Sequence, residues 1–296
     1  MSDACRISLG GQEAVIAPVG AKLCQYRVNG ADAVVGFEPG ATPPAFNGAV
    51  LAPWPNRLRD GVFTWDGVRY QLPITEPDRM TALHGLMCWH RWGVVDRDAA
   101  SVTLGLDLPP QPGWPFRLRL EVRYALSNDG LAIEVVTSNL GQTALPYGVG
   151  FHPWLSTGGA SLDDCTLQLD AATHIVADER LLPAGAEPVA GAYDLRRPSS
   201  LAGLDLDDAW ADALPDASGR AWGCLARPDG RSVCVWMQAP LTCWQVCTGD
   251  HIDGFRRVGV AVEPMTCLAD AFTTGEHLIR LEAGSSHRVR WGIQMC

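Results

Sequence analysis

Apolar and polar residues alternate along several stretches of the chain with a period of two, which is typical of half-buried β-strands. The clearest stretch covers residues 116–126, where every second residue is apolar or aromatic and Arg or Glu stands at most positions between. Ser127-Asn128-Asp129-Gly130 has turn composition, and residues 131–137 alternate again. The pattern predicts an antiparallel hairpin with one buried face.

Similar strand signals recur along the rest of the chain. Residues 63–70 form a predicted hairpin with Asp66-Gly67 as its two-residue turn. Short helices are predicted only near residues 45–51 and 206–213, and the Pro-, Ala- and Gly-rich residues 178–200 are predicted to form a long surface loop. Further strands are predicted at residues 232–238, 242–248, 258–262 and 289–294.

Closely spaced strands with turn signals between them are typical of an all-β sandwich. The chain has 296 residues, 47% of them hydrophobic, which is enough to bury a large core. No internal repeat or linker-like charge run divides it. We therefore expect an all-β fold, a large antiparallel β-sandwich with few short helices, built as a single domain over residues 1–296.

Charge and terminal sequence restrict the partners and the location. The net charge of −10 argues against nucleic acid and against anionic lipid, since both are bound through Lys and Arg. No signal peptide is visible, and residues 39–56, which carry no charged side chain, contain five prolines and are no membrane span. The ten cysteines include no Cys-x-x-Cys, so we expect reduced core thiols in a cytoplasmic protein.

Three titratable residues in apolar or glycine-flanked segments are candidates for chemistry. Glu263 follows the apolar residues Val260 and Val262, and a carboxyl group in apolar surroundings has a raised pKa that suits a general base. His84 and His152 each stand in a short apolar segment. Taken singly, each is more often an ordinary residue: an exposed strand-end Glu, and a histidine in the core or in a loop. A zinc site of the three is the competing interpretation, but no short His-x-x-x-His spacing supports it.

Polar and aromatic residues near these segments are candidates for binding. Arg57, which follows Asn56 in a Pro-rich segment, offers a planar set of donors to hydroxyls or carboxylates, or a surface ion pair. Asp207 and Asp208 suit a helix N-terminus or a binding site. Trp54 and Trp154 flank the motifs and suit either sugar rings or core packing. No Gly-x-Gly-x-x-Gly, Walker loop or Gly-x-Ser-x-Gly is present, which argues against nucleotide cofactors and serine hydrolase chemistry.

Four segments in order resemble the aldose 1-epimerases, the galactose-mutarotase-like family. They are Asn56-Arg57-Leu58-Arg59-Asp60-Gly61, Ala82-Leu83-His84-Gly85, Gly150-Phe151-His152-Pro153 and Val262-Glu263-Pro264-Met265-Thr266. Asp270-Ala271-Phe272 with Gly275-Glu276 matches the family's ending. The resemblance spans residues 7–294 and implies a large antiparallel sandwich with its site in a cleft.

The resemblance also implies an activity and residue roles. The activity is the interconversion of the α and β anomers of a free sugar by ring opening and closure, with no cofactor and no metal. Glu263 looks like the general base, and a protonated His152 looks like the general acid on the opposite side of the sugar. His84 and Arg57 look like groups that bind and polarise the sugar, and Asp207 like the hydroxyl-binding aspartate, with Asn56, Trp54 and Trp154 beside them.

Departures from the family pattern leave the substrate open. Leu86 stands where the galactose-specific branch has a second Gly, and Pro153-Trp154 differs from the aromatic run of that branch. The alternatives are a non-catalytic carbohydrate-binding protein on the same fold, and an epimerase of a charged 6-phospho or 6-sulfo hexose for which Arg91 is a conceivable contact. A metal-dependent isomerase or lyase is a third. We expect a monosaccharide partner and a monomer or homodimer.

Overall fold

The hairpin predicted from strict alternation is present in the computed structural model, which describes residues 3–296. Strand β12 (Leu118–Ser127) and strand β13 (Gly130–Asn139) pair antiparallel with Ser127 opposite Gly130. Along both strands, buried residues alternate with partly or fully exposed ones. The predicted hairpin β7 (Val62–Trp65) and β8 (Val68–Gln71) is confirmed as well.

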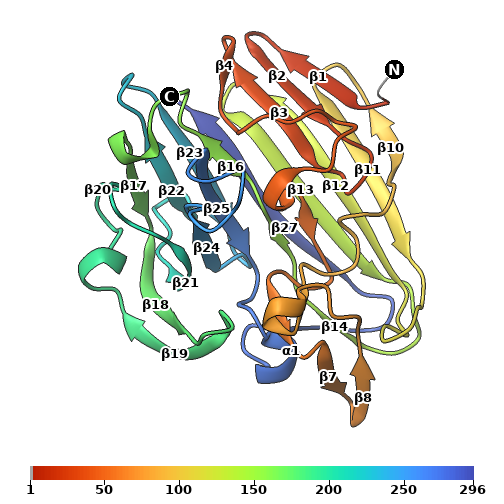
Figure 1. The fold of residues 1–296 in the computed structure, drawn as a ribbon. Coiled ribbons are helices and arrows are strands. Elements are labelled where there is room, and N and C mark those ends of the chain that lie inside the picture. Colours follow the sequence, from red (N-terminus) through yellow and green to blue (C-terminus); the bar gives the residue numbers. More distant parts are fainter. Residues whose placement is uncertain (1–2) are drawn as a thin grey trace.

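Two large sheets dominate the molecule (Figure 1). All of their neighbouring strands pair antiparallel. The nine-stranded sheet has the order β10 (Gly93–Arg97), β11 (Ser101–Leu108), β12, β13, β27 (Ser286–Met295), β23 (Ser232–Gln238), β22 (Arg220–Ala226), β17 (Thr166–Leu169), β20 (Ser199–Ser200). The eight-stranded sheet has the order β19 (Pro183–Pro188), β18 (Ala171–Ala177), β21 (Asp207–Ala213), β24 (Cys243–Cys247), β25 (Gly259–Met265), β15 (Gly150–Phe151), β5 (Val50–Leu51), with β16 (Trp154–Ser156) also paired to β25.

Smaller elements complete the fold. Figure 1 shows the N-terminal sheet, in red, beside the yellow and green strands β10–β13. The small sheets are β1 (Cys5–Leu9), β2 (Gln12–Ile16), β3 (Leu23–Val28) and β4 (Ala31–Asp32); β14 (Leu145–Tyr147) with β26 (Ile279–Leu281); and β6 (Arg57–Arg59) with β9 (Thr81–Leu83). The helices are α1 (Ala271–Thr274) and the 3-10 turns η1 (Pro44–Phe46), η2 (Pro77–Arg79), η3 (Leu162–Asp164) and η4 (Gly191–Tyr193). Within residues 3–296 no helix has the length and apolar character needed to cross a membrane.

The core lies where the inner faces of the two large sheets meet. Phe151 of β15 packs on Trp291 of β27, with ring centroids 4.9 Å apart. Gly223 of β22 approaches β25 so closely that a Cβ there would lie 2.6 Å from Val262 Cγ1. Interdigitation of two antiparallel sheets across an apolar layer defines a β-sandwich. The predicted fold class is therefore confirmed.

Three local predictions are wrong. Residues 206–213, predicted as a helix, contain strand β21, which pairs with β18 and β24. Residues 45–51 contain the end of η1 followed by strand β5 rather than one helix. Residues 178–200 are not a continuous loop, because they contain β19 and η4. In each case sheet pairing, which depends on distant residues, overrides the local preference of the sequence.

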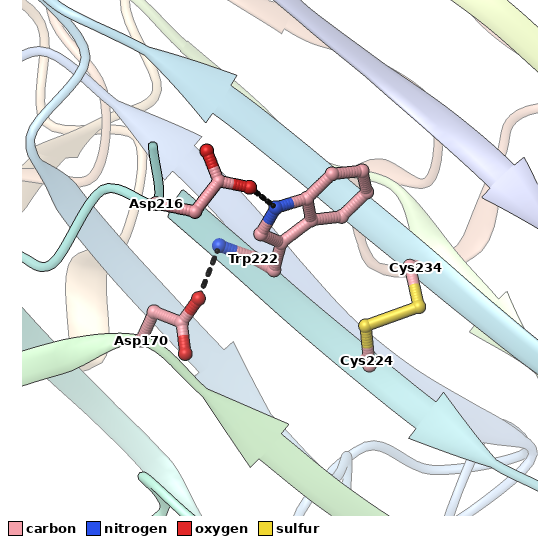
Figure 2. Close-up of a disulfide and its surroundings, with 5 residues drawn as sticks. All are labelled: Asp170, Asp216, Trp222, Cys224 and Cys234. Carbon is pink, nitrogen blue, oxygen red and sulfur yellow. Dashed lines mark hydrogen bonds between the residues drawn. A yellow bond between two sulfur atoms is a disulfide. The ribbon is translucent and has the colours of Figure 1, made fainter. Parts of the chain in front are cut away.

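The expectation of reduced cysteines is also wrong for one pair. Cys224 of β22 and Cys234 of β23 stand directly opposite each other, with Cα atoms 4.1 Å apart, and form a disulfide. Figure 2 shows it beside Trp222, whose indole Nε1 donates to Asp216 and whose backbone N–H donates to Asp170. The other cysteines are free thiols, and all of them except Cys296 are buried.

Candidate active site

Neighbouring strands of the eight-stranded sheet bring a set of polar side chains to one face. Glu263 of β25 stands directly opposite Gln245 of β24, and Asp207 of β21 stands directly opposite Cys247 of β24. Because directly opposed residues, and residues two apart on one strand, point to the same side of a sheet, these four side chains share a face. That face forms the floor of a cavity of about 210 Å³.

The short sheet β6–β9 supplies the wall of the cavity. Arg57 pairs with Leu83 across this sheet, which places the neighbouring residues Asn56 and His84 together. The backbone N–H of His84 donates to the Asn56 carbonyl at 2.9 Å, and the Asn56 N–H donates to His84 Nδ1 at 3.2 Å. Since Nδ1 accepts a hydrogen bond, the neutral His84 ring carries its proton on Nε2. Both residues have left-handed backbone conformations, with φ of 56° and 61°, and such conformations concentrate at functional sites.

His152 lies between β15 and β16, next to Glu263. Its backbone N–H donates to the Ala49 carbonyl and its carbonyl accepts from Gly48. Nε2 of the ring lies 3.3 Å from Glu263 Oε1. The ring stacks on Trp154 at a centroid distance of 5.9 Å and meets the His84 ring edge-on at 5.3 Å. An imidazole and a carboxyl group are thus held in direct contact on one side of the cavity.

The structure brings together most of the residues predicted from the sequence. The cavity is lined by Glu263, His152, His84, Arg57, Asn56, Asp207 and Trp154. Three residues that the sequence suggested for the site lie elsewhere. Trp54 is buried against Phe272 and donates to the Ala82 carbonyl, so it packs the core. Asp208 contacts His174, and Arg91 pairs with Asp3 beside a different cavity, so Arg91 gives no support to a charged sugar in this site.

The relative position of the acid and base groups differs from the expectation. The resemblance implied that Glu263 and His152 stand on opposite sides of a bound hexose. The 3.3 Å between Nε2 and Oε1 leaves no room for a sugar between them. The two groups are therefore neighbours that reach a ligand from the same side.

Several cavity residues were not predicted. Glu76, which precedes η2, accepts two hydrogen bonds from Arg57, at 2.9 and 3.0 Å, and one from Thr81 at 2.6 Å. Gln245 connects the floor of the cavity to its wall. Its side-chain oxygen accepts a hydrogen bond from Asn56, and its side-chain nitrogen donates one to Asp207 Oδ1 at 2.8 Å. The sequence gives one usable signal here: Gln245 is the polar residue in the otherwise apolar run Cys-Trp-Gln-Val-Cys. Further lining residues without a sequence signal are Ala45, Phe46, Arg79, Leu83, Cys247, His251 and Ile252.

Burial disfavours the charged forms of Glu263, His152 and His84. Burial, helped by the negative charge of Asp207 and opposed by Arg57, raises the pKa of Glu263 well above its ordinary value. Burial and the Arg57 charge lower the pKa of His152 to about 3. Burial also lowers the pKa of His84, with His152 and Arg57 adding to the effect. Both imidazoles are therefore neutral near pH 7, in contrast to the protonated His152 that the resemblance implied.

Metal ligation by His84, His152 and Glu263 is not favoured by this geometry. His84 uses Nδ1 as an acceptor for the Asn56 N–H. Over residues 3–296, one set of three possible metal-ligating side chains has its ligand atoms within 4.8 Å of one another: Asp207, Cys247 and His251. Burial raises the pKa of the Cys247 thiol, which keeps this sulfur protonated and makes it a poor ligand at neutral pH.

The fold and the cavity define a class of protein, and comparisons with known proteins support it. An antiparallel sandwich with this strand arrangement is a galactose mutarotase-like fold: the solved structure of galactose 1-epimerase from Lactobacillus acidophilus superposes with a TM-score of 0.82 at 19% identity, over 99% of this chain and 94% of that one. The family model of aldose 1-epimerase matches residues 4–294. The chain therefore belongs to the aldose 1-epimerase family.

Two sequence relatives place the chain within that family. The uncharacterized protein YihR of Escherichia coli K12 is 34% identical over 290 residues, which are 97% of this chain and 91% of YihR. Galactose mutarotase of Pongo abelii is 29% identical over 219 residues, which are 70% of this chain and 62% of that protein.

Proposed function

We propose that the protein is a mutarotase that interconverts the α and β anomers of a free aldose. One observation carries the proposal: a carboxyl group and an imidazole, 3.3 Å apart and both buried, form part of the lining of a small cavity with Arg57 and Asp207. Glu263 Oε2 has no hydrogen-bond partner within residues 3–296. Buried polar atoms without a partner are rare in proteins, and a catalytic role is one reason for which they are kept. The names of the relatives from Lactobacillus and Pongo point to the same reaction.

The reaction needs two proton transfers at neighbouring atoms. A base removes the proton of the anomeric hydroxyl as an acid gives a proton to the ring oxygen, so the C1–O5 bond breaks and a C1=O1 carbonyl forms. Rotation about C1–C2 and the reverse transfers close the ring on the other face. Because both oxygens are bonded to C1, the acid and the base must lie close together. The adjacency of Glu263 and His152 therefore suits this chemistry better than placement across the sugar does.

The pair holds one proton to share. Their shifts place this proton on the Glu263 carboxyl and leave the His152 ring neutral when no sugar is bound, with Nε2 facing the carboxyl at 3.3 Å. Transfer from Oε1 to Nε2 gives a carboxylate and an imidazolium with the same total number of protons. In that form Glu263 is the general base and His152 the general acid. The developing charge on the sugar oxygens is stabilised by Arg57 and by the Nε2–H of His84.

The other cavity residues hold the sugar. The Arg57 guanidinium is fixed by its paired hydrogen bonds to Glu76, which orient its remaining donors. Asp207, held by Gln245, accepts from sugar hydroxyls, and Asn56 is held by the other end of the same Gln245 amide. The Trp154 ring stacks on the His152 ring and so helps to fix its orientation.

Glu263→Gln tests the assignment, because it keeps the shape of the side chain and removes its proton chemistry. We expect fresh α-glucose or α-galactose to relax polarimetrically at least about 100-fold more slowly with this variant than with the wild type, the lower end of general acid–base contributions. Glu13→Gln, the same change at an exposed position of strand β2, is the matched control and is expected to keep full activity. Full activity of Glu263→Gln in a folded protein would exclude Glu263 as the base.

Anomer-exchange NMR over a panel of aldoses separates the remaining functions. Acceleration with neutral aldoses supports the proposal. Calorimetric sugar binding without acceleration for any sugar would indicate a carbohydrate-binding protein instead. Acceleration confined to 6-phospho or 6-sulfo hexoses would assign the same chemistry to a charged substrate.

A further inference from the structure

A second and larger cavity lies at the N-terminal side of the molecule. Its volume is about 520 Å³, and its lining combines apolar residues such as Val19, Phe37 and Trp89 with the charged residues Asp3, Lys22 and Arg91. Arg91 is paired with Asp3, so these two charges neutralise each other. Lys22 is the remaining charged group of the lining.

Lys22 is the only lysine of the chain, and it is buried. Its exposed fraction is 2%, whereas lysines almost never lie buried without a partner. Its Nζ lies 3.9 Å from the centroid of the Trp89 ring. Across residues 3–296, no carboxylate forms an ion pair with it, and no acceptor forms a hydrogen bond with its Nζ. A buried ammonium group in contact with an aromatic face still leaves three N–H donors to be satisfied.

The groups around Lys22 do not supply the missing negative charge. Burial raises the pKa of the Cys24 thiol to about 12 and that of the Cys88 thiol to about 11, so both thiols are neutral at pH 7. Glu38 is exposed. Since Asp3 and Arg91 cancel, Lys22 is the one basic group of the described lining without a neutralising partner, and burial lowers its pKa from the ordinary value.

We propose that this cavity is a binding site for a small organic monocarboxylate, whose carboxylate binds Lys22 and whose apolar part packs against Trp89. One carboxylate supplies the single negative charge and accepts the free N–H donors of Lys22. The apolar lining favours an organic anion over an inorganic one, because the body of the ligand leaves water for Trp89 and Phe37.

This site is separate from the aldose cavity, and it does not rest on the proposed function. Phe46 lines the aldose cavity, Trp89 lines the second one, and the two rings contact each other with centroids 5.6 Å apart. None of the catalytic candidates Glu263, His152 and His84 lines the second cavity.

Calorimetric titration with sodium benzoate tests the proposal. We expect one molecule to bind per chain and the affinity to fall at least about tenfold in Lys22→Met, which keeps the length of the side chain and removes its charge. Arg69→Met, on exposed strand β8, removes one positive charge elsewhere and is expected to bind as the wild type does. No heat of binding in the wild type, or equal affinity in Lys22→Met, would overturn the proposal.

A labelling experiment on the wild type covers the case in which Lys22→Met does not fold. Because Lys22 is the only lysine, reductive methylation with formaldehyde and cyanoborohydride has two targets, Lys22 and the amino terminus, which mass spectrometry of peptides separates. We expect Lys22 to be methylated more slowly in sodium benzoate than in sodium chloride at equal ionic strength. The rate at the amino terminus is expected to be the same in both salts. Unchanged labelling with benzoate, or equal protection by inorganic phosphate, contradicts an organic carboxylate site.

Discussion

At the scale of single residues, the contact between Glu263 and His152 is the basis of the proposed chemistry. Exposed to water, a Glu side chain would be charged near neutral pH and a His side chain would be partly charged. Burial shifts both toward their neutral forms, so the pair carries one proton between them. Such a pair provides an acid and a base together without a net charge in the core.

The one-proton pair predicts the acid side of the activity profile. A second proton enters the pair only near pH 3, where His152 titrates. We therefore expect kcat/KM, measured by polarimetry with the buffer reaction subtracted, to remain level from about pH 7 to about pH 5. An acid limb with a midpoint near 6.5, the ordinary value for His, would show that His152 titrates as an exposed imidazole.

The sequence reveals the reactive residues of the site better than their partners. Glu263, His152, His84 and Arg57 stand in recognisable motifs, and the cavity contains all of them. Glu76 lies in a segment whose approach to Arg57 depends on the pairing of β6 with β9, which no local pattern shows. The shift of the His152 pKa likewise results from burial by distant elements, so the sequence could not predict it.

At the scale of elements, strand pairing decides structure where local preference is weak. The run from Leu206 to Ala213 is rich in Ala and Asp and lacks β-branched residues, so local preference favours a helix. Pairing with β18 on one side and β24 on the other makes it strand β21 and places Asp207 at the cavity. By contrast, β12 and β13 alternate so regularly that the sequence alone predicts them.

The turn after β9 depends on a glycine. Gly85 has φ of 74°, and a Cβ on it would lie 2.2 Å from the Ala52 carbonyl oxygen. Gly85→Ala is therefore expected to lower the free energy of unfolding by about 1–3 kcal/mol, measured by urea denaturation. We also expect it to displace His84 and to slow the proposed mutarotation.

Gly67→Ala is the matched control for this substitution. Gly67 also has a positive φ, of 80°, but a Cβ there meets no atom within 4 Å. Only the backbone cost remains, so we expect a loss of about 1 kcal/mol and normal activity. Equal losses in the two variants would show that the contact with Ala52 does not constrain the turn.

At the scale of the whole molecule, the buried histidines and Glu263 link stability to pH in opposite directions. The unfolded chain protonates His84 and His152 below about 6.5 and the folded chain does not, so stability falls as the pH decreases from 6.5. The folded chain keeps the Glu263 proton above 4.5 and the unfolded chain loses it, so this group lowers stability as the pH rises through that range. Among these three groups, the two histidines outweigh the one carboxyl group between pH 4.5 and 6.5, and only Glu263 contributes above 6.5.

Variants separate these two contributions. Relative to the wild type, His84→Gln is expected to gain stability on acidification below pH 6.5, by up to about 1.4 kcal/mol for each pH unit. Glu263→Gln is expected to gain stability relative to the wild type as the pH rises above 4.5. Urea midpoints at a series of pH values provide the measurement. Parallel curves for the wild type and both variants would show that these groups have ordinary pKa values in the folded state.

Under the proposed mutarotase function, the burial of Lys22 has a further consequence. Apart from Lys22 and the histidines, the basic side chains of the protein are all arginines. The positively charged side chains on its surface are therefore guanidinium groups. Glycation begins when the aldehyde of an open-chain sugar condenses with a free amine. A mutarotase generates that aldehyde at every turnover. Because its one ε-amine is buried, the molecular surface offers open-chain sugar no exposed lysine to modify.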